Sequence, residues 1–573
     1  MAVSGSRVKT ALFGFIVKRV SFLAVIALVV GACWLFVLPL PGQFRNTYIS
    51  ENALLPGQAQ AYFRSSEWHY LRGYKEEVRR LSDKPASEVV ESLSTILSEQ
   101  GYYTDVYHHE PDKATVYGIF RAPRGDNTEA IVLVCPWTNG NGLFNFNGIA
   151  IGLALARYLT KWSVWSKSLI FVFPPDPHKS LREWVAAYHR SLPIQAGSIE
   201  GALVLDYPSD LSGFSAIDIS YTGLNGQLPN LDLINTVVTI ADFNSLPTFI
   251  HGGLDKLFNA LPSFLNPLKS SAYFQLLSTL LSSVAAQVTS GLNRVAGCES
   301  FSGWRIDAIT ISAIPTSELS HDETVYGRII EGTLRSINNL LEHFHQSFFF
   351  YLLLSPHHFV SIGTYLPAAM SIAGAFTLQG ISKWISYIQN GSSRSSILKA
   401  FFVEAAILAF TFALLSFSLL FDSQLVAQML PTFCACIIPT ALYASPMSYA
   451  LLNEIHGVAL VLSGMALTAL ATLNFSLALV VGLISSPLMF LKPGINRMHA
   501  GILLLVLNPF FIFYFVGMFT NGYTYIINTF VSSWRDMQVW TWIIVMCLWL
   551  PLWEVSAFIS MANVREEAKK EVK

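Results

Sequence analysis

Four acidic or imidazole side chains in the middle of the chain have the chemistry of zinc ligands. They are Asp176, His178, Asp206 and His321. A hydrolytic zinc site needs such ligands to converge on one point, together with a carboxylate base and an open coordination position. These residues are widely spread along the chain, and Asp or His at such places is also typical of helix caps and solvated loops. We therefore favour capping, and a metal site remains the alternative.

Three continuous apolar runs place these residues in a predicted sheet. Ile131–Cys135, Leu169–Phe173 and Ala202–Leu205 are typical of strands that are buried on both faces. Helix-like patterns alternate with them, which predicts a mostly parallel sheet with helices on both faces. Ligands bind at the carboxyl ends of the strands in such folds. The residues that directly follow each strand are therefore the informative ones.

Other catalytic chemistries are not indicated. The sequence contains no Gly-x-Ser-x-Gly elbow, no Walker loop and no His-Glu-x-x-His motif. Cys135 is followed by Pro136 and Trp137 in an apolar setting, which is typical of an inert packed thiol. Six cysteines, mostly in apolar stretches, are not a disulfide framework. A net charge of −1 argues against a nucleic-acid partner.

Composition divides the chain into a soluble region and two membrane regions. Only 13% of the 573 residues are charged, against about 25% in a soluble protein. Residues 41–346 look like an ordinary soluble domain, whereas 20–40 and 347–562 are apolar. Basic residues in 1–19 precede the first predicted span, which places that segment in the cytosol. The apolar run is long for a signal peptide, so we predict a retained anchor.

The second apolar region predicts about seven further spans, giving about eight in all. They fall near 359–382, 398–421, 425–444, 456–472, 475–491, 500–519 and 538–561. Basic loops and the tail 563–573 then fall in the cytosol, and the domain 41–346 lies on the other side. Glu404 and Glu554 are exceptional charges within spans, and each is expected to be interfacial. The uncharged stretch 270–293 is predicted to be an amphipathic helix, packed or on the membrane surface, and not a span.

Several longer motifs resemble a known family. They are Arg45–Leu54, Arg121–Asp126, Gly223–Asp232, Arg335–Leu340, and Trp184 with Ala187–His189. They closely resemble the GPI-anchor attachment proteins, the large aminopeptidase-like subunits of GPI transamidase, and most of all the fungal members. The resemblance implies a multi-pass protein of the endoplasmic reticulum membrane with a zinc-aminopeptidase-like α/β domain in the lumen. It also implies partners: other transamidase subunits including a caspase-like cysteine subunit, the GPI lipid and the precursor protein.

The zinc site of such peptidases can be compared with this chain position by position. Pro136 stands where the peptidases have a His, and Phe144 precedes the next helix where they have a bridging Asp. No Glu lies in Pro175–His178, where their Glu pair falls, and only Asp206 and His321 match. Two ligands are too few for a catalytic zinc. We therefore predict no metal, no cofactor and no catalytic residue, with Asp206 and His321 as vestiges.

Five polar residues are candidates for contact with the GPI lipid. Tyr48, Ser50, Glu51 and Asn52 follow the first span, and Asn508 interrupts a later one. The alternatives are that the first four only dock the span on the domain, and that Asn508-Pro509 is only a packing kink.

Three functions are consistent with the sequence. The leading one is a non-catalytic subunit that presents the lipid to the catalytic partner. The second is a metal-dependent amide-forming or amide-cleaving enzyme that uses Asp206 and His321. The third is an assembly scaffold.

Overall fold

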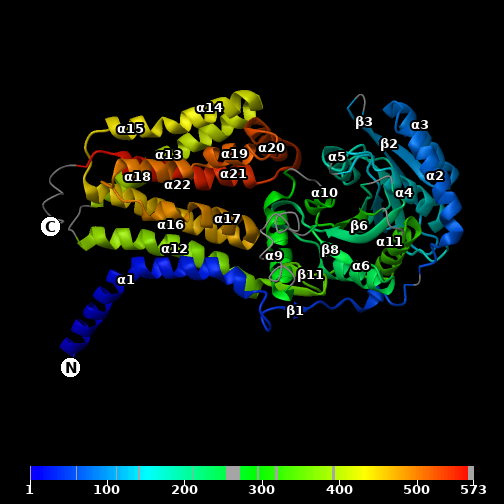
Figure 1. The fold of residues 1–573 in the computed structure, drawn as a ribbon, viewed down its shortest axis with the longest axis horizontal. Helices are drawn as coiled ribbons and strands as arrows, with labels where there is room; N and C mark the ends of the chain where they lie inside the picture. The colour runs from blue at the N-terminus through cyan, green and yellow to red at the C-terminus, as the bar shows by residue number, and fades with distance from the viewer. Residues whose placement is uncertain are drawn as a thin grey trace. The chain divides into compact units, whose positions relative to one another are not determined.

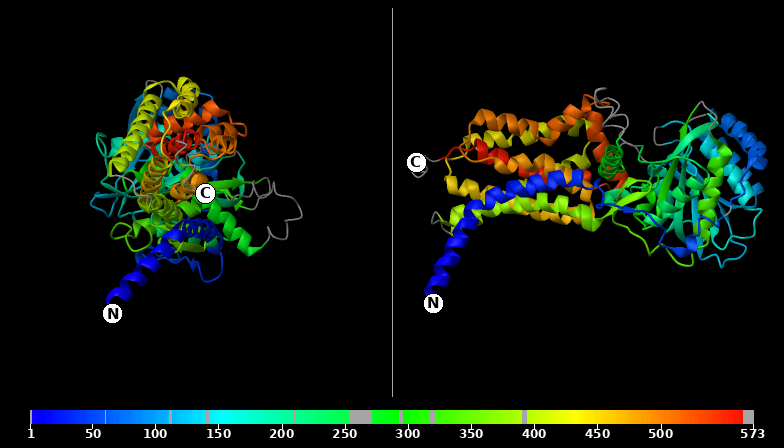
Figure 2. Two further views of the ribbon diagram at one scale, coloured as in Figure 1. Left: turned by 90° about the vertical axis from the view of Figure 1, so that its left-hand side faces the viewer. Right: turned by 60° about the horizontal axis from the view of Figure 1, so that its bottom comes forward.

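A computed structural model describes most of the chain as two compact units (Figures 1 and 2). The described residues are 2–59, 61–110, 113–139, 142–208, 211–252, 271–292, 296–316, 321–389 and 394–564, without the side chains of 2–18 and 386–396. An α/β unit comprises Pro39–Ile362, and a helical unit comprises Met1–Leu38 with Gly363–Lys573. The basic tail 565–573 lies outside the described residues.

A nine-stranded mixed sheet forms the centre of the α/β unit, in the order β10-β7-β9-β6-β4-β5-β3-β2, with β8 beside β7. The strands are β2 (Tyr103–Glu110), β3 (Lys113–Phe120), β4 (Glu129–Val134), β5 (Ser168–Phe173), β6 (Ser198–Asp206), β7 (Gly213–Ser220), β8 (Thr248–Ile250), β9 (Ala308–Pro315) and β10 (His321–Asp322). Only β5, β4, β6 and β9 form a continuous parallel block, and their flanks are antiparallel. The prediction of a mostly parallel sheet therefore describes its central strands.

Helices cover both faces of the sheet. They are α2 (Trp68–Leu81), α3 (Ala86–Glu99), α4 (Phe146–Leu159), α5 (Lys179–Tyr188), α6 (Leu231–Phe243), α9 (Ala272–Thr289), α10 (Glu299–Ser302) and α11 (Glu323–Asn338). Ile131 and Leu133 of β4 belong to the core on the α4 face, whereas Val132 and Val134 belong to the core that contains Trp184 of α5. This alternation follows from the two-residue period of a strand. It explains why the strand runs are continuously apolar.

A small second sheet corrects the predicted domain boundary. It pairs β1 (Arg45–Asn46) with a hairpin of β11 (Tyr351–Ser355) and β12 (His358–Ser361). We predicted that 347–562 belongs to the membrane bundle, but the hairpin is part of the α/β unit. Its side chains, such as the fully buried Leu353, pack inside that unit. An apolar run alone does not distinguish a buried hairpin from the start of a span.

The stretch 270–293 contains a packed helix, as one of the two predicted options proposed. Helix α9 covers the hairpin, and the Ser283 hydroxyl donates to the Leu353 carbonyl oxygen over 3.1 Å. Tyr221 donates in turn to Ser283 over 3.4 Å. The helix is not among the segments that are long and apolar enough to span a membrane. Residues 270 and 293 lie outside the described residues.

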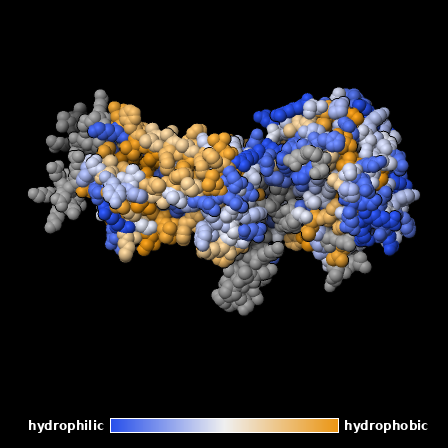
Figure 3. Space-filling view, turned by 90° about the horizontal axis from the view of Figure 1, so that it is seen from above, coloured by the Kyte–Doolittle hydropathy of each residue, from blue (hydrophilic) through white to orange (hydrophobic). Residues whose placement is uncertain are grey.

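Within its described residues, the helical unit contains five helices that are long and apolar enough to cross a membrane, or six if the bent pair α18–α19 counts as one span. Its elements are α1 (Ala2–Val37), α12 (Ile362–Gln389), α13 (Arg394–Leu420), α14 (Ser423–Ala435), α15 (Ile437–Tyr443), α16 (Tyr449–Leu473), α17 (Phe475–Ser485), α18 (Arg497–Val506), α19 (Pro509–Gly517), α20 (Tyr523–Met537), α21 (Thr541–Ile544), and α22 (Leu550–Met561), which is joined to α21 by one π-turn. Figure 3 shows apolar residues over much of the face that this unit presents in that view. The other two predicted spans coincide with α12 and with α17, so the count of about eight stays a prediction.

Several polar residues of the helical unit differ from their predicted positions. Glu404 and Glu554 are 4% and 0% exposed, so both side chains are covered by other residues of the unit. Lys383, assigned to a cytosolic loop, is a buried residue of α12 whose Nζ donates to the Leu491 carbonyl oxygen over 3.1 Å. A predicted loop instead forms the amphipathic helix α20, and its Arg535 donates to the Leu419 carbonyl oxygen over 2.6 Å.

Candidate functional site

A peptidase-type metal site is expected at the carboxyl edge of the sheet. Two chain segments at this edge are held together by the side-chain amide of Asn145. Its Nδ2 donates to the carbonyl oxygens of Pro136 and Leu205 over 3.1 and 3.0 Å. Its Oδ1 accepts from the Tyr207 N–H over 3.0 Å. Asn145 is fully buried and precedes α4, so it ties the segments after β4 and β6 together. The side chain that lies between these strand ends is therefore a neutral amide with all three bonds made to backbone.

Two of the four candidate zinc ligands, Asp176 and Asp206, accept hydrogen bonds from nearby residues. Asp176 accepts from the His178 N–H over 3.0 Å and from the Ser180 N–H and hydroxyl over 3.2 and 2.6 Å, which caps α5. Asp206 accepts from Ser312 over 2.9 Å, and His321 lies in β10. No three His, Cys, Asp or Glu side chains within the described ranges form a group that could hold a metal. The residues present do not fit a pair of co-catalytic zinc ions.

The segment after the first span is fixed on α6 by its backbone. Asp232 accepts from the N–H groups of Ser50 and Glu51 over 3.0 and 2.7 Å. Asn235 donates to the Tyr48 carbonyl oxygen over 2.8 Å. The Glu51 side chain is buried, whereas Tyr48 is 54% exposed and Asn52 is also exposed. Docking therefore holds the backbone of this segment and leaves the side chains of Tyr48 and Asn52 accessible.

Asn508 belongs to the other unit and lies at a sharp bend. Helices α18 and α19 meet there at 55°. The Asn508 Oδ1 caps α19 by accepting from the Phe510 and Phe511 N–H groups over 2.9 and 3.2 Å. The residue also lines a mainly apolar pocket of about 530 Å³, together with Tyr514 and Trp553. The bend is thus a capped helix start beside a cavity, and Asn508 puts a polar group on its wall.

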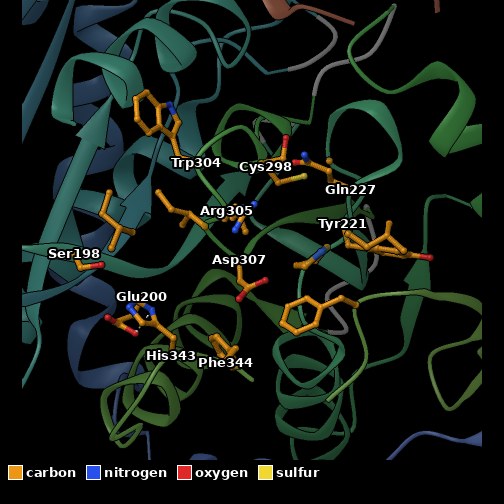
Figure 4. Close-up of a pocket in the computed structure, with 18 of the residues that line it drawn as sticks. Ser198, Glu200, Tyr221, Gln227, Cys298, Trp304, Arg305, Asp307, His343 and Phe344 are labelled. Carbon is orange, nitrogen blue, oxygen red and sulfur yellow. Dashed lines mark ion pairs between the residues drawn. The ribbon is translucent and has the colours of Figure 1, made fainter. Parts of the chain in front are cut away.

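A larger pocket, of about 610 Å³, lies at the opposite, amino-terminal edge of the sheet (Figure 4). It is formed where β6 and β9 begin, beside the turn that carries Trp304 and the loop that leads to β11. Its polar side chains include Glu200, Asp307, His343 and Arg305. Sequence reasoning missed this site. The available signal was Glu200, a charged residue inside an apolar strand run.

One buried and one partly buried carboxyl group give this pocket its character. Glu200 is 2% exposed, and its Oε2 lies 2.8 Å from Nδ1 of His343, whose side chain is 66% exposed. The Asp307 Oδ1 accepts from the Asn230 N–H over 2.7 Å. Burial raises the pKa of Glu200, and it raises the pKa of Asp307 to about 6. The pocket therefore favours a ligand that places a positive charge beside Glu200 and Asp307.

Rings form much of the remaining wall. Tyr221, Trp304, Phe344, Phe349 and Phe350 all line the pocket. A wall of aromatic rings beside carboxylates is suited to sugars, which stack on rings, and to ammonium groups, which bind ring faces. Cys298 also lines the pocket, and its thiol lies 3.9 Å from Oε2 of Glu299. Burial raises the pKa of this thiol well above its usual value, so the lining is better suited to binding than to nucleophilic chemistry.

An α/β unit followed by several helices that are long and apolar enough to cross a membrane indicates a membrane protein. Residues 112–557 match the model of the Gaa1-like family of GPI transamidase components. The chain is 36% identical to "GPI transamidase component GAA1" of Saccharomyces cerevisiae, covering 97% of this chain and 98% of the relative. It is 30% identical to the Schizosaccharomyces pombe component, covering 89% and 88%. The chain belongs to this family of GPI transamidase components.

Solved structures resemble the α/β unit more distantly. A glutaminyl cyclase of Porphyromonas gingivalis is 11% identical with a TM-score of 0.27, covering 48% of this chain and 95% of that chain. The Bacillus subtilis YXEP protein, a dinuclear metal-binding peptidase, is 12% identical with a TM-score of 0.26, covering 48% and 98%. With TM-scores below 0.5, these likenesses carry no argument about the site, which rests on the side chains described above.

Proposed function

We propose that this chain is a non-catalytic subunit of GPI transamidase that recognises the GPI lipid and presents it to a subunit with a cysteine nucleophile. The observation that carries the non-catalytic part is the hydrogen-bonding of Asn145. Its amide occupies the place between the strand ends where a hydrolase of this kind has metal ligands, and its bonds go to backbone. Asp176 is engaged in a cap in the same region. The chemistry therefore belongs to a partner.

Recognition of the lipid is supported by polar groups beside apolar surfaces. A glycolipid needs an apolar surface for its chains and hydrogen-bonding groups for its glycan. The helical unit offers the cavity with Asn508 on its wall, and the α/β unit offers the accessible side chains of Tyr48 and Asn52. Ser50 and Glu51 then support the segment through their backbone bonds to Asp232.

The proposal includes a location. The chain lies in the endoplasmic reticulum membrane with 41–346, extended by the hairpin that ends at Ser361, in the lumen. Both termini, 1–19 and 563–573, are cytosolic. The basic residues that flank the apolar segments support this orientation.

A photo-crosslinkable GPI lipid added to the purified transamidase complex tests the proposal. We expect it to label this chain, and Asn508→Ala to reduce the labelling several-fold. Asn496→Ala is the matched control, because Asn496 caps α18 in the same way, accepting from the Met498 N–H over 2.9 Å, and does not line the cavity. If the lipid labels other subunits but never this chain, the chain would instead be an assembly scaffold that does not contact the lipid.

Metal analysis of the same complex separates the proposal from the enzyme alternative. Stoichiometric zinc in this chain, with activity lost in Asp206→Ala or His321→Ala and folding intact, would show that the chain is itself a metal-dependent amide-forming or amide-cleaving enzyme.

A further inference from the structure

We infer that the pocket at the amino-terminal edge of the sheet binds a ligand carrying a primary ammonium group, through the carboxylates of Glu200 and Asp307. The inference rests on the proposed function only in one respect, the identity of the molecule that carries the ammonium group. An amine-bearing part of a GPI glycan and a free amino-alcohol phosphate present the same chemistry. The pocket volume, about 610 Å³, is that of a site for a ligand larger than a single ethanolamine.

The state of Glu200 is the first observation. Its side chain is 2% exposed, and its Oε1 accepts no hydrogen bond within the described part of the chain. Its Oε2 faces His343, which Figure 4 shows at the side of the pocket. A buried carboxylate oxygen that accepts no hydrogen bond destabilises the folded protein unless a cation or a hydrogen-bond donor contacts it. An ammonium group supplies three donors and the missing charge.

Asp307 is the second, independent observation. It comes directly before β9, whereas Glu200 lies in β6, so two neighbouring parallel strands each present a carboxyl group to one pocket. The Asn230 N–H satisfies only Oδ1 of Asp307. In Figure 4 the Asp307 carboxyl lies between the Glu200–His343 pair and the ring of Tyr221. Carboxylates and ring faces together form the environment that ammonium groups prefer.

His343 and Lys167 favour the carboxylate form of Glu200, but the opposing effect of burial is larger, and the pKa of Glu200 stays raised. Lys167 is in ion-pair contact with Glu129. The His343 side chain is mostly exposed, so water screens its interaction with Glu200. Arg305 lines the pocket but is itself exposed, and at the mouth it suits a phosphate on the same ligand.

Binding of ethanolamine phosphate and glucosamine to the full chain in detergent tests the inference. Calorimetry is expected to show that both amines bind, whereas N-acetylethanolamine phosphate and N-acetylglucosamine do not. Glu200→Gln and Asp307→Asn keep the side-chain shapes and should each weaken amine binding at least tenfold. Glu88→Gln is the control, because Glu88 is an exposed residue of α3 that pairs with Lys84.

Three results would overturn the inference: equal binding of the acetylated probes, unchanged binding in both pocket variants, or loss of subunit assembly in Glu200→Gln without any amine binding. The last result would assign the pocket to a basic side chain of a partner subunit. Photo-GPI labelling separates this failure from failure of the proposed function. Retained labelling in a chain that binds no amine refutes only the pocket, whereas amine binding in a chain that is never labelled refutes only the lipid function.

Discussion

Replacing Asp307 by asparagine is expected to stabilise the α/β unit at neutral pH while it removes amine binding. Burial is the main cause that raises the pKa of Asp307 from its usual 3.8 to about 6, and the carboxylate of Glu200 adds to it. The Asn230 N–H and His343 act in the opposite direction. In the wild type, the Asn230 N–H donates to Oδ1 of Asp307 over 2.7 Å. An asparagine at position 307 keeps this acceptor oxygen and carries no charge. The variant thus removes the buried charge without removing its hydrogen bond.

The magnitude follows from the two pKa values. An acid whose pKa is raised on folding stabilises the folded state at low pH, and this stability is lost as the pH rises through the folded-state value. For Asp307 the loss runs from about pH 4 to about pH 6. A difference of about two pKa units corresponds to about 3 kcal/mol. The wild type should therefore lose up to about 3 kcal/mol across this range relative to Asp307→Asn.

Hydrogen exchange of the full chain in detergent measures this difference strand by strand. The amides of β6 and β9, next to the pocket, should exchange at similar opening free energies in both proteins near pH 4. They should open more easily in the wild type at pH 7. His343→Ala in both backgrounds removes the imidazole that acts on both Glu200 and Asp307. A variant that opens more easily than the wild type at pH 7, or a difference that does not change with pH, would refute the reasoning.

Three further changes test other parts of the structure. Asn145→Ala leaves two buried carbonyl groups and one N–H without their partner and should destabilise the α/β unit by about 2 to 4 kcal/mol in hydrogen exchange; a change below about 0.5 kcal/mol would contradict this. Asp232→Ala should free the segment around Ser50, and limited proteolysis should then cut there, while an uncut segment would deny its docking role. Gly31→Val would place Cβ 2.7 Å from the Ala368 carbonyl oxygen and should loosen α1 from α12 by about 1 to 3 kcal/mol. Unchanged crosslinking between engineered cysteines on α1 and α12 would contradict that contact.

Local sequence patterns predicted the parts of the fold that depend on local composition. The runs at Ile131, Leu169 and Ala202 are strands β4, β5 and β6, because a strand buried on both faces must be apolar at every position. The cap at Asp176 was predicted for the same kind of reason, since its partners are a few residues away. The apolar helices likewise lie where hydropathy predicted them.

Local sequence patterns did not predict the features that depend on contacts between residues far apart in the chain. The hairpin Tyr351–Ser361 falls in the region 347–562 that was assigned to the helical bundle because of its apolar composition. Its pairing with Arg45 and its packing under α9 place it in the α/β unit. Lys383 was assigned to a loop and Glu554 to a span end, and neither assignment indicated that the side chain is buried in the helical unit. Asn145 gave no signal, because its partners at Pro136 and Leu205 come together only in the folded sheet.

The sequence by itself determined that this chain has an α/β domain beside apolar helices, and that it belongs with the GPI transamidase components. Hydropathy, strand periods and long motifs are properties of neighbouring residues, so they can be read without coordinates. Only the tertiary structure decided which polar groups are buried together. Glu200, Asp307 and His343 come from three separate segments, and no sequence pattern shows that they lie together. The charge of Glu200 and Asp307, and their capacity to bind an amine, depend on how far each carboxyl group is buried beside the other. That burial is a property of the packed sheet alone.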